Sequence, residues 1–115
     1  MDFIRSANAK ATAVKTSVQK LSIVADMIRG MSAAQALLQL QFCKRKVARD
    51  VMAVLSSAIA NAENNNNLDI DKLFVSSINV GKAFSLKRFH PRARGRAGAI
   101  RKYFSNITIY VTERG

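Results

Sequence analysis

The stretch "KRFHPRARGRAGAIRKYF", Lys87 to Phe104, holds the only proline, the only histidine and two of the five glycines of the chain. Basic side chains crowd it, and it carries no acidic residue. Strand-like sequences flank it, because "LFVSSINV" (Leu73 to Val80) comes before it and "NITIYVT" (Asn106 to Thr112) follows it. The fold of the chain therefore depends on how the intervening segment connects these two strands.

The connection between the two strands, Gly81 to Ser105, is too long for an ordinary loop. A structureless loop of this length is uncommon in a compact domain and is usually functional or disordered. The alternative is that the flanking strands continue outward as a long two-stranded ribbon, with Pro91 and Gly95 at its turn. Such a ribbon is marginal in water by itself, so we expect a partner to order it.

The charge of the connection indicates the kind of partner. The chain has 19 Lys and Arg against 7 Asp and Glu, a net charge of +12, and residues 82 to 102 supply +8 of it. Arginine presents a planar fork of donors that fits phosphate and stacks on bases. Arg92, Arg94 and Arg96 alternate, so they would share one face of an extended strand. This charge predicts a polyanionic partner, with nucleic acid favoured over an anionic membrane surface.

Aromatic residues flank the basic stretch: Phe84, Phe89, Tyr103 and Phe104. They can stack on bases or anchor the ribbon to the rest of the chain. For Tyr103 and Phe104, which lie nearest the following strand, we favour simple packing.

Two helices are expected in the first half of the chain. Thr16 with Gln19 fits a capping box before the first helix, and Gly30 fits the residue that follows its end. Ser32 with Gln35 fits a second capping box, before a short helix rich in Ala and Leu. The residues before Thr16 lack a clear period and are expected to form an extended arm or an edge strand.

A third and longest helix is expected from about Lys44 to about Asn64, ended by the asparagine run that follows. Its apolar positions recur at helical spacing. They are Val47, Val51, Val54, Leu55, Ala58, Ile59 and Ala62. Three helices followed by two strands predict a single α+β domain with an antiparallel sheet.

Four cations, Lys44, Arg45, Lys46 and Arg49, stand at the start of this third helix. The helix dipole is positive there, so their placement costs some stability. Either an anionic partner offsets this cost, or the cluster is a plain solvated face. The sequence alone favours neither interpretation.

Catalytic, metal-binding and membrane functions find little support. His90 has no Cys or second His at ligand spacing, so no zinc site is expected. No Gly-rich phosphate motif is present either, and we expect no cofactor. Asp69 and Asp71 precede a strand, where turn-forming roles are commoner than catalysis. Cys43 is the only cysteine and cannot form an internal disulfide, which favours a reducing compartment such as the cytoplasm. We expect no membrane partner, because the basic segment contains Pro and Gly and is no amphipathic helix.

The spacing of these residues resembles a known family, the bacterial and organellar large-subunit ribosomal protein twenty-two (the universal uL-twenty-two family). Its signature runs from Lys87 to Val111. The matching residues are Lys87, Arg92, Ala93, Gly95, Arg96, Asn106, Ile107, Ile109 and Val111. The segments "IVADMIRG" (residues 23–30) and "SAIANAENN" (residues 57–65) also look like family segments. The resemblance spans nearly the whole chain.

The resemblance implies an α+β fold with three helices packed on a small antiparallel three-stranded sheet. A globular body, residues 1–81 and 105–115, would carry a protruding basic β-hairpin of about residues 82–104. The implied function is that of a structural constituent of the large ribosomal subunit, not an enzyme, in the cytoplasm or an organelle. It would bind 23S-type rRNA and staple rRNA domains together during assembly. The body would lie near the exit of the peptide tunnel, beside neighbouring ribosomal proteins, and the hairpin tip would line the tunnel and meet the nascent polypeptide.

The resemblance and the charge pattern together give two sets of candidate residues. The expected rRNA-binding residues are Lys15, Lys20, Lys44, Arg45, Lys46, Arg49, Lys82, Lys87, Arg88, Arg101 and Lys102. The expected tunnel-lining tip is Phe89, His90, Pro91, Arg92, Ala93, Arg94, Gly95, Arg96 and Ala97. The competing hypothesis is a free nucleic-acid-binding or chaperone-like protein that uses the same arginines against any phosphate backbone.

The chain departs from the family pattern at three places. Asn106 stands where the family commonly has His, and Ser22 stands at a position that is often basic. Before the hairpin, where the family commonly has an acidic pair and a proline, this chain has Gly81, Lys82 and Phe84. The hairpin base is therefore expected to be more basic here.

Overall fold

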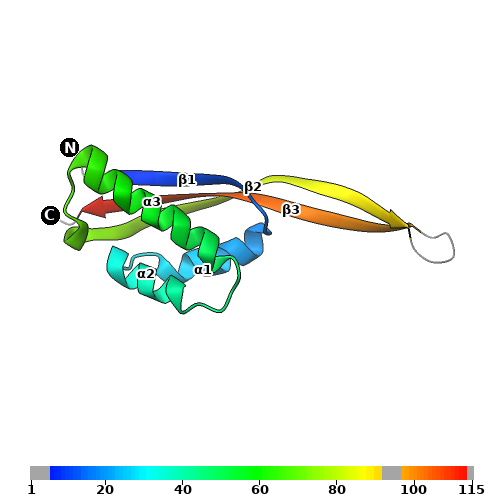
Figure 1. Cartoon of the computed structure of the whole chain (residues 1–115), viewed down its shortest axis with the longest axis horizontal. Helices are drawn as coiled ribbons and strands as arrows, with labels where there is room; N and C mark the ends of the chain where they lie inside the picture. Colours follow the sequence, from blue (N-terminus) through cyan, green and yellow to red (C-terminus); the bar gives the residue numbers. More distant parts are fainter. Residues whose placement is uncertain (1–5, 92–96, 114–115) are drawn as a thin grey trace.

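The computed structural model describes residues 6–91 and 97–113, and side chains for residues 6–85 and 102–113. The elements follow the order β1 (Ser6–Val14), α1 (Val18–Ile28), α2 (Ala33–Gln41), α3 (Ala48–Asn66), the 3₁₀ helix η2 (Ile70–Lys72), β2 (Leu73–Pro91) and β3 (Ala97–Glu113). The strands form one antiparallel sheet in the order β1-β3-β2, with α1, α2 and α3 on one of its faces (Figure 1). The predicted α+β fold is confirmed. No helix of the described residues is long and apolar enough to span a bilayer.

The first two helices begin at serine caps, and a glycine follows the end of α1, nearly as predicted. Ser17 Oγ accepts from the Lys20 N–H at 3.4 Å, so the cap of α1 lies one residue after the predicted Thr16. The predicted cap of α2 is confirmed, because Ser32 Oγ accepts from the Gln35 N–H at 3.4 Å. Gly30 has a φ of +84°, the left-handed geometry expected after the end of a helix.

The third helix, α3, begins at Ala48 and not at the predicted Lys44. The preceding residues, Lys-Arg-Lys-Val, include no Ser, Thr, Asp or Asn to cap an earlier start. The chain instead forms turns there, with the Ala48 N–H bonded to the Arg45 carbonyl at 3.1 Å. At its other end the asparagine run stops the helix as predicted, because Asn67 adopts a φ of +52° that asparagine tolerates.

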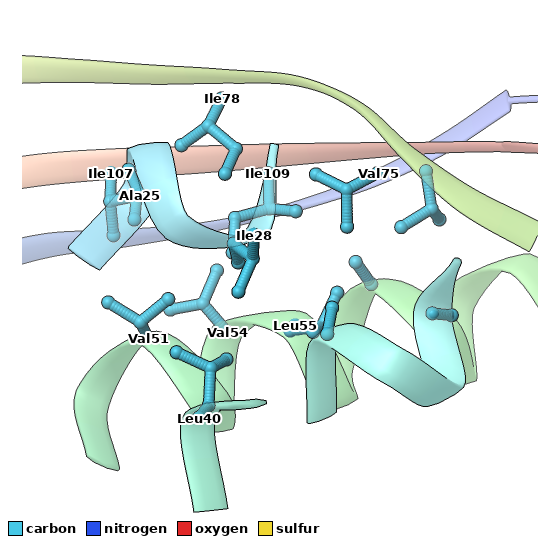
Figure 2. Packing of buried hydrophobic residues seen from close by; sticks show 14 of the residues in the cluster. Ala25, Ile28, Leu40, Val51, Val54, Leu55, Val75, Ile78, Ile107 and Ile109 are labelled. Atoms are coloured by element: carbon cyan, nitrogen blue, oxygen red, sulfur yellow. The ribbon is translucent and has the colours of Figure 1, made fainter. Parts of the chain in front are cut away.

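The core fills the space between the helices and the inner face of the sheet (Figure 2). The alternation predicted for the last strand is confirmed, since Ile107, Ile109 and Val111 are fully buried. The apolar stripe predicted on α3 is buried except for Ile59, which is half-buried at its margin. Burial of these side chains removes apolar surface from water and is the main force that holds the two layers together.

The outer edge of β2 is covered by the link between α1 and α2. The Gly30 N–H donates to the Val75 carbonyl at 3.0 Å, and the Val75 N–H donates to the Met31 carbonyl at 2.8 Å. Arg29 donates from Nη2 to the Ile78 carbonyl at 3.1 Å and from Nη1 to Asp26 at 2.7 Å. These bonds occupy backbone groups that an exposed sheet edge would leave unpaired.

Beyond Lys82 and Ser105, β2 and β3 continue as a two-stranded ribbon. They pair from Leu73 with Glu113 to Pro91 with Ala97, whereas the pairing of β1 with β3 ends where Val14 meets Ser105. The predicted ribbon is therefore confirmed over the described residues. Between residues 82 and 91 it extends by about 30 Å, at ~3.3 Å per residue. It gives the molecule its long axis, since the principal extents are 65 × 27 × 19 Å (Figure 1).

Pro91 is the last residue of β2, so the prediction that it lies within the turn is wrong. A proline is tolerated here because β2 is an edge strand, where its missing N–H need not pair. Gly95, the other residue predicted at the turn, lies outside the described residues.

Candidate nucleic-acid interface

Three separate segments bring basic side chains into one hollow of about 500 Å³. Lys15 follows the end of β1, Lys20 stands in the first turn of α1, and Arg45 and Lys46 belong to the loop before α3. The lining is Lys15, Thr16, Lys20, Arg45, Lys46, Val47 and Asp50. We call this space the first hollow.

A second hollow of about 600 Å³ shares Arg45 and Lys46 with the first. Its lining is Leu40, Gln41, Cys43, Lys44, Arg45, Lys46, Arg49 and Met52. The linings of the two hollows together include every residue outside the hairpin that the sequence predicts to bind rRNA. We call these residues the basic body patch: Lys15, Lys20, Lys44, Arg45, Lys46 and Arg49.

The cations of the basic body patch are not neutralised by acidic neighbours. The only ion pair among the described residues joins Arg29 to Asp26, and neither belongs to the patch. Among the described residues that line the two hollows, Asp50 is the only one with a carboxylate. Like charges gathered this closely repel one another, so an anion that enters the patch gains attraction from several cations at once.

Acidic residues gather instead at the opposite end of the body. Glu63 stands near the end of α3, and Glu113 is the last residue of β3. Glu113 accepts from the Asp69 N–H at 2.7 Å, and Asp69 accepts from the Asp71 N–H at 3.0 Å. This last bond caps η2 and confirms the turn-forming role predicted for Asp69. α3 runs from the loop of the basic body patch toward this acidic end (Figure 1). Positive charge therefore gathers at one end of the body and negative charge at the other.

The basic body patch lies at the end of the body from which the hairpin projects (Figure 1). Lys82 and Lys102 stand at the root of the hairpin, exposed and half-buried respectively. Further out, Lys87 is the register partner of Arg101, and Arg88 is that of Ile100. The predicted basic residues of the hairpin thus continue the charge of the patch along both strands.

The tip residues are only partly within the described structure. Phe89 and His90 precede Pro91 in β2, and Ala97 begins β3. The remaining predicted tip residues, Arg92, Ala93, Arg94, Gly95 and Arg96, lie outside the described residues.

One aromatic pair stabilises the root of the hairpin. The rings of Phe84 and Phe104 stack across the two strands with centroids 4.6 Å apart and planes 20° apart. The packing role predicted for Phe104 is therefore confirmed. Tyr103 is 45% exposed, so the packing predicted for it is wrong. Successive strand residues face opposite sides of the sheet, and the side that receives Tyr103 is open.

Phe42 is a candidate contact that sequence reasoning missed. It follows the end of α2, and its side chain is 76% exposed directly before the loop of the basic body patch. An exposed aromatic ring beside clustered cations is a surface on which a base can stack. The signal was present in "FCKRK", residues 42–46, where an aromatic residue adjoins the basic run.

The role of Asn106 was also not apparent from the sequence. Its side-chain oxygen accepts from the Ala13 N–H at 3.1 Å. The neighbouring Ser105 is buried and donates from Oγ to the Thr16 carbonyl at 2.8 Å. These partners are 93 and 89 residues away along the chain, so no local pattern could have revealed them.

Comparison with known proteins gives one consistent result. The family described as "Ribosomal protein L22p/L17e" matches residues 9–112. The chain is 54% identical over 108 residues to "Large ribosomal subunit protein uL22" of Rhodospirillum centenum, covering 94% of this chain and 82% of that protein. It is 55% identical over 109 residues to the protein of that name from Rhodospirillum rubrum (95% and 86%). For the one from Rickettsia canadensis the identity is 52% over 108 residues (94% and 91%).

Proposed function

This chain belongs to the ribosomal protein L22p/L17e family, and we propose that it is a structural constituent of the large ribosomal subunit that binds 23S-type rRNA. The observation that carries the proposal is the family match over residues 9–112. Relatives at 52–55% identity bear the name of a large-subunit ribosomal protein. The family is one of structural proteins, so the chain is not an enzyme.

The basic body patch supplies the first rRNA contact in this proposal. Its cations come from three segments and lack acidic partners among the described residues, so they are available to phosphate oxygens. Each phosphate that a cation neutralises releases a condensed counterion, which makes binding favourable at low salt. Arg45 and Lys46 line both hollows and would contact the RNA strand between them.

The hairpin supplies the second contact. Residues 82–102 carry eight basic residues and no acid, a composition suited to surroundings of RNA on every side. Because the hairpin projects along the 65 Å axis, it reaches rRNA segments that the body does not touch. Two such contacts on one continuous sheet would staple separate rRNA domains together during assembly.

We further propose that the tip, Phe89 to Ala97, lines the peptide exit tunnel and meets the nascent polypeptide. The resemblance of the signature around Arg92 and Gly95 to the ribosomal family motivates this placement. The body would then remain near the outer mouth of the tunnel. Its acidic end, around Asp69 and Glu113, repels RNA and would face neighbouring ribosomal proteins.

A competition experiment separates this function from that of a generic nucleic-acid binder. The probe is a transcript of the large-subunit rRNA of Rhodospirillum rubrum, whose protein is 55% identical to this chain. We expect unlabelled transcript to displace the probe at a concentration at least a hundredfold lower than bulk transfer RNA does. Equal competition by both RNAs, with a steep salt dependence, would instead identify a free nucleic-acid-binding protein.

A further inference from the structure

The chain leaves β1 by an irregular turn just before Lys15. The pairing of β1 with β3 shifts register between Ala11 and Val14. Within this shift Ala13 has a φ of +56°, a left-handed conformation that residues with a Cβ rarely adopt. The Thr16 N–H then donates to the Val14 carbonyl at 2.8 Å. This turn takes Lys15 out of the sheet and into the lining of the first hollow.

Two adjacent side chains of β3 hold the turn from either side of Lys15. Asn106 Oδ1 accepts from the Ala13 N–H at 3.1 Å, and Ser105 Oγ donates to the Thr16 carbonyl at 2.8 Å. Ser105 is 1% exposed and is the only buried polar residue among those with described side chains. A strained backbone persists only where surrounding contacts fix it, and these two bonds do so.

The same two residues mark the root of the hairpin. Ser105 is the register partner of Val14 on one side and of Lys82 on the other, so β1 ends its pairing where the two-stranded ribbon begins. Asn106 pairs with Gly81 at the adjacent position. The turn that places Lys15 in the wall of the first hollow is therefore bonded to the short segment of β3 at which the two-stranded ribbon begins.

We infer that Ser105 and Asn106 are positioning residues for a site in the first hollow that binds a backbone phosphate of RNA. They hold Lys15 in the lining beside Lys20, Arg45 and Lys46. In the described part of this lining the four cations outnumber the one carboxylate, that of Asp50. Lysine has a flexible side chain, so fixing its backbone reduces the freedom that is lost when it contacts phosphate. This inference rests on the proposed rRNA binding. It adds that Ser105 and Asn106 hold one of the phosphate-binding lysines, Lys15, in place.

A double-mutant cycle on the full chain tests the inference. The affinity for the Rhodospirillum rubrum rRNA transcript is measured over a series of NaCl concentrations for wild type, Lys15→Ala, Asn106→Ala and the double variant. We expect Lys15→Ala to weaken binding about tenfold and to lower the salt slope by about 1, the effect of one lost phosphate contact. Asn106→Ala should weaken binding at least threefold, yet add nothing once Lys15 is absent, because it acts through Lys15.

Asn61→Ala is the matched control. Asn61 also hydrogen-bonds to the backbone of β1, donating from Nδ2 to the Asn8 carbonyl at 2.9 Å, but away from Lys15. We expect it to lower the melting temperature as Asn106→Ala does while leaving RNA affinity and salt slope unchanged. Ser105→Ala removes the second bond of the turn and should couple to Lys15 in the same way as Asn106→Ala.

Three outcomes would overturn the inference. Asn106→Ala could leave the affinity for the transcript unchanged, or it could weaken binding equally in the presence and absence of Lys15. The third outcome is that Asn61→Ala weakens binding as much as Asn106→Ala does. In each of these cases a wild-type preference for the rRNA transcript would leave the proposed function standing. Failure of the wild type to prefer that transcript would overturn the proposed function and this inference together. All affinities are compared at a temperature where circular dichroism shows every variant folded.

Discussion

At the scale of single residues, two arginines of the body serve different purposes. Arg29 is bound to Asp26 and to the Ile78 carbonyl, so it belongs to the fold. Arg49 stands in the first turn of α3, close to the positive end of the helix dipole, and lines the second hollow. The first stabilises the body, whereas the second costs stability and is kept available for an anion.

Alanine at these two positions should therefore have opposite effects. We expect Arg49→Ala to raise the free energy of unfolding by about 0.3–1 kcal/mol, because an unfavourable dipole interaction is removed, and to weaken rRNA binding. Arg29→Ala should lower the free energy of unfolding by about 1 kcal/mol and leave binding unchanged. Urea unfolding and transcript binding measure both quantities. Equal binding by the two variants would contradict the assignment of Arg49 to the RNA surface.

Phe42 offers a second residue-scale prediction. Replacing it with Ala should barely change stability, since its side chain is 76% exposed. Binding to rRNA should weaken by about 1–3 kcal/mol if a base stacks on the ring, without a change in the salt slope. Leu38→Ala is the control, because Leu38 is 54% exposed one turn earlier on α2 and has no aromatic face. A loss of similar size in the control would rule out stacking.

At the scale of elements, the hairpin and the body depend on different interactions. The body is held by a core that extends from Ala7 in β1 to Val111 in β3. Within residues 6–91 and 97–113, no third strand pairs with the ribbon beyond Lys82, and an isolated two-stranded ribbon is marginal in water. The division of the chain into body and hairpin remains a prediction, and it can be tested directly.

Deletion of Phe89 to Ala97 with a short glycine-containing turn should leave the body folded. Thermal unfolding should stay cooperative, because the buried core formed by the residues with described side chains lies between the three helices and the body part of the sheet. The variant should still bind rRNA through the basic body patch, with a smaller salt slope than the full chain. Loss of cooperative unfolding would show that the hairpin is an integral part of the folding unit.

Local signals in the sequence were enough to predict most of the helices and strands. The caps at Ser32 and Gly30, the asparagine stop of α3 and the alternation of Ile107 and Ile109 each depend on neighbouring residues, and each was predicted correctly. The start of α3 was predicted too early, because basic residues are compatible with a helix but cannot cap one.

The sequence was enough to predict which basic residues form the site, but not how they are arranged in space. Lys15 and Arg45 are thirty residues apart in sequence, and only the packing of α1 and α3 against the sheet places both in one hollow. The hydrogen bonds of Ser105 and Asn106 to the segment around Lys15 depend on strand pairing across most of the chain. Such long-range contacts leave no pattern in the local sequence.

At the scale of the whole molecule, shape and charge follow the same axis. The radius of gyration is 17.3 Å. A compact domain of this length would have a radius of about 13 Å, so the hairpin accounts for the difference. Basic residues concentrate at the hairpin and at its root, whereas Asp69, Asp71 and Glu113 gather at the opposite end. A long-range field of this kind orients the molecule so that the hairpin end meets RNA first.

Sedimentation of the tagged protein from a cell lysate on a sucrose gradient tests whether this protein is a constituent of the large ribosomal subunit. We expect the protein to migrate with large subunits and with assembled ribosomes, and to stay there after a moderate salt wash. Recovery of the protein only in the slowly sedimenting fractions at the top of the gradient would show that it is not a ribosomal constituent.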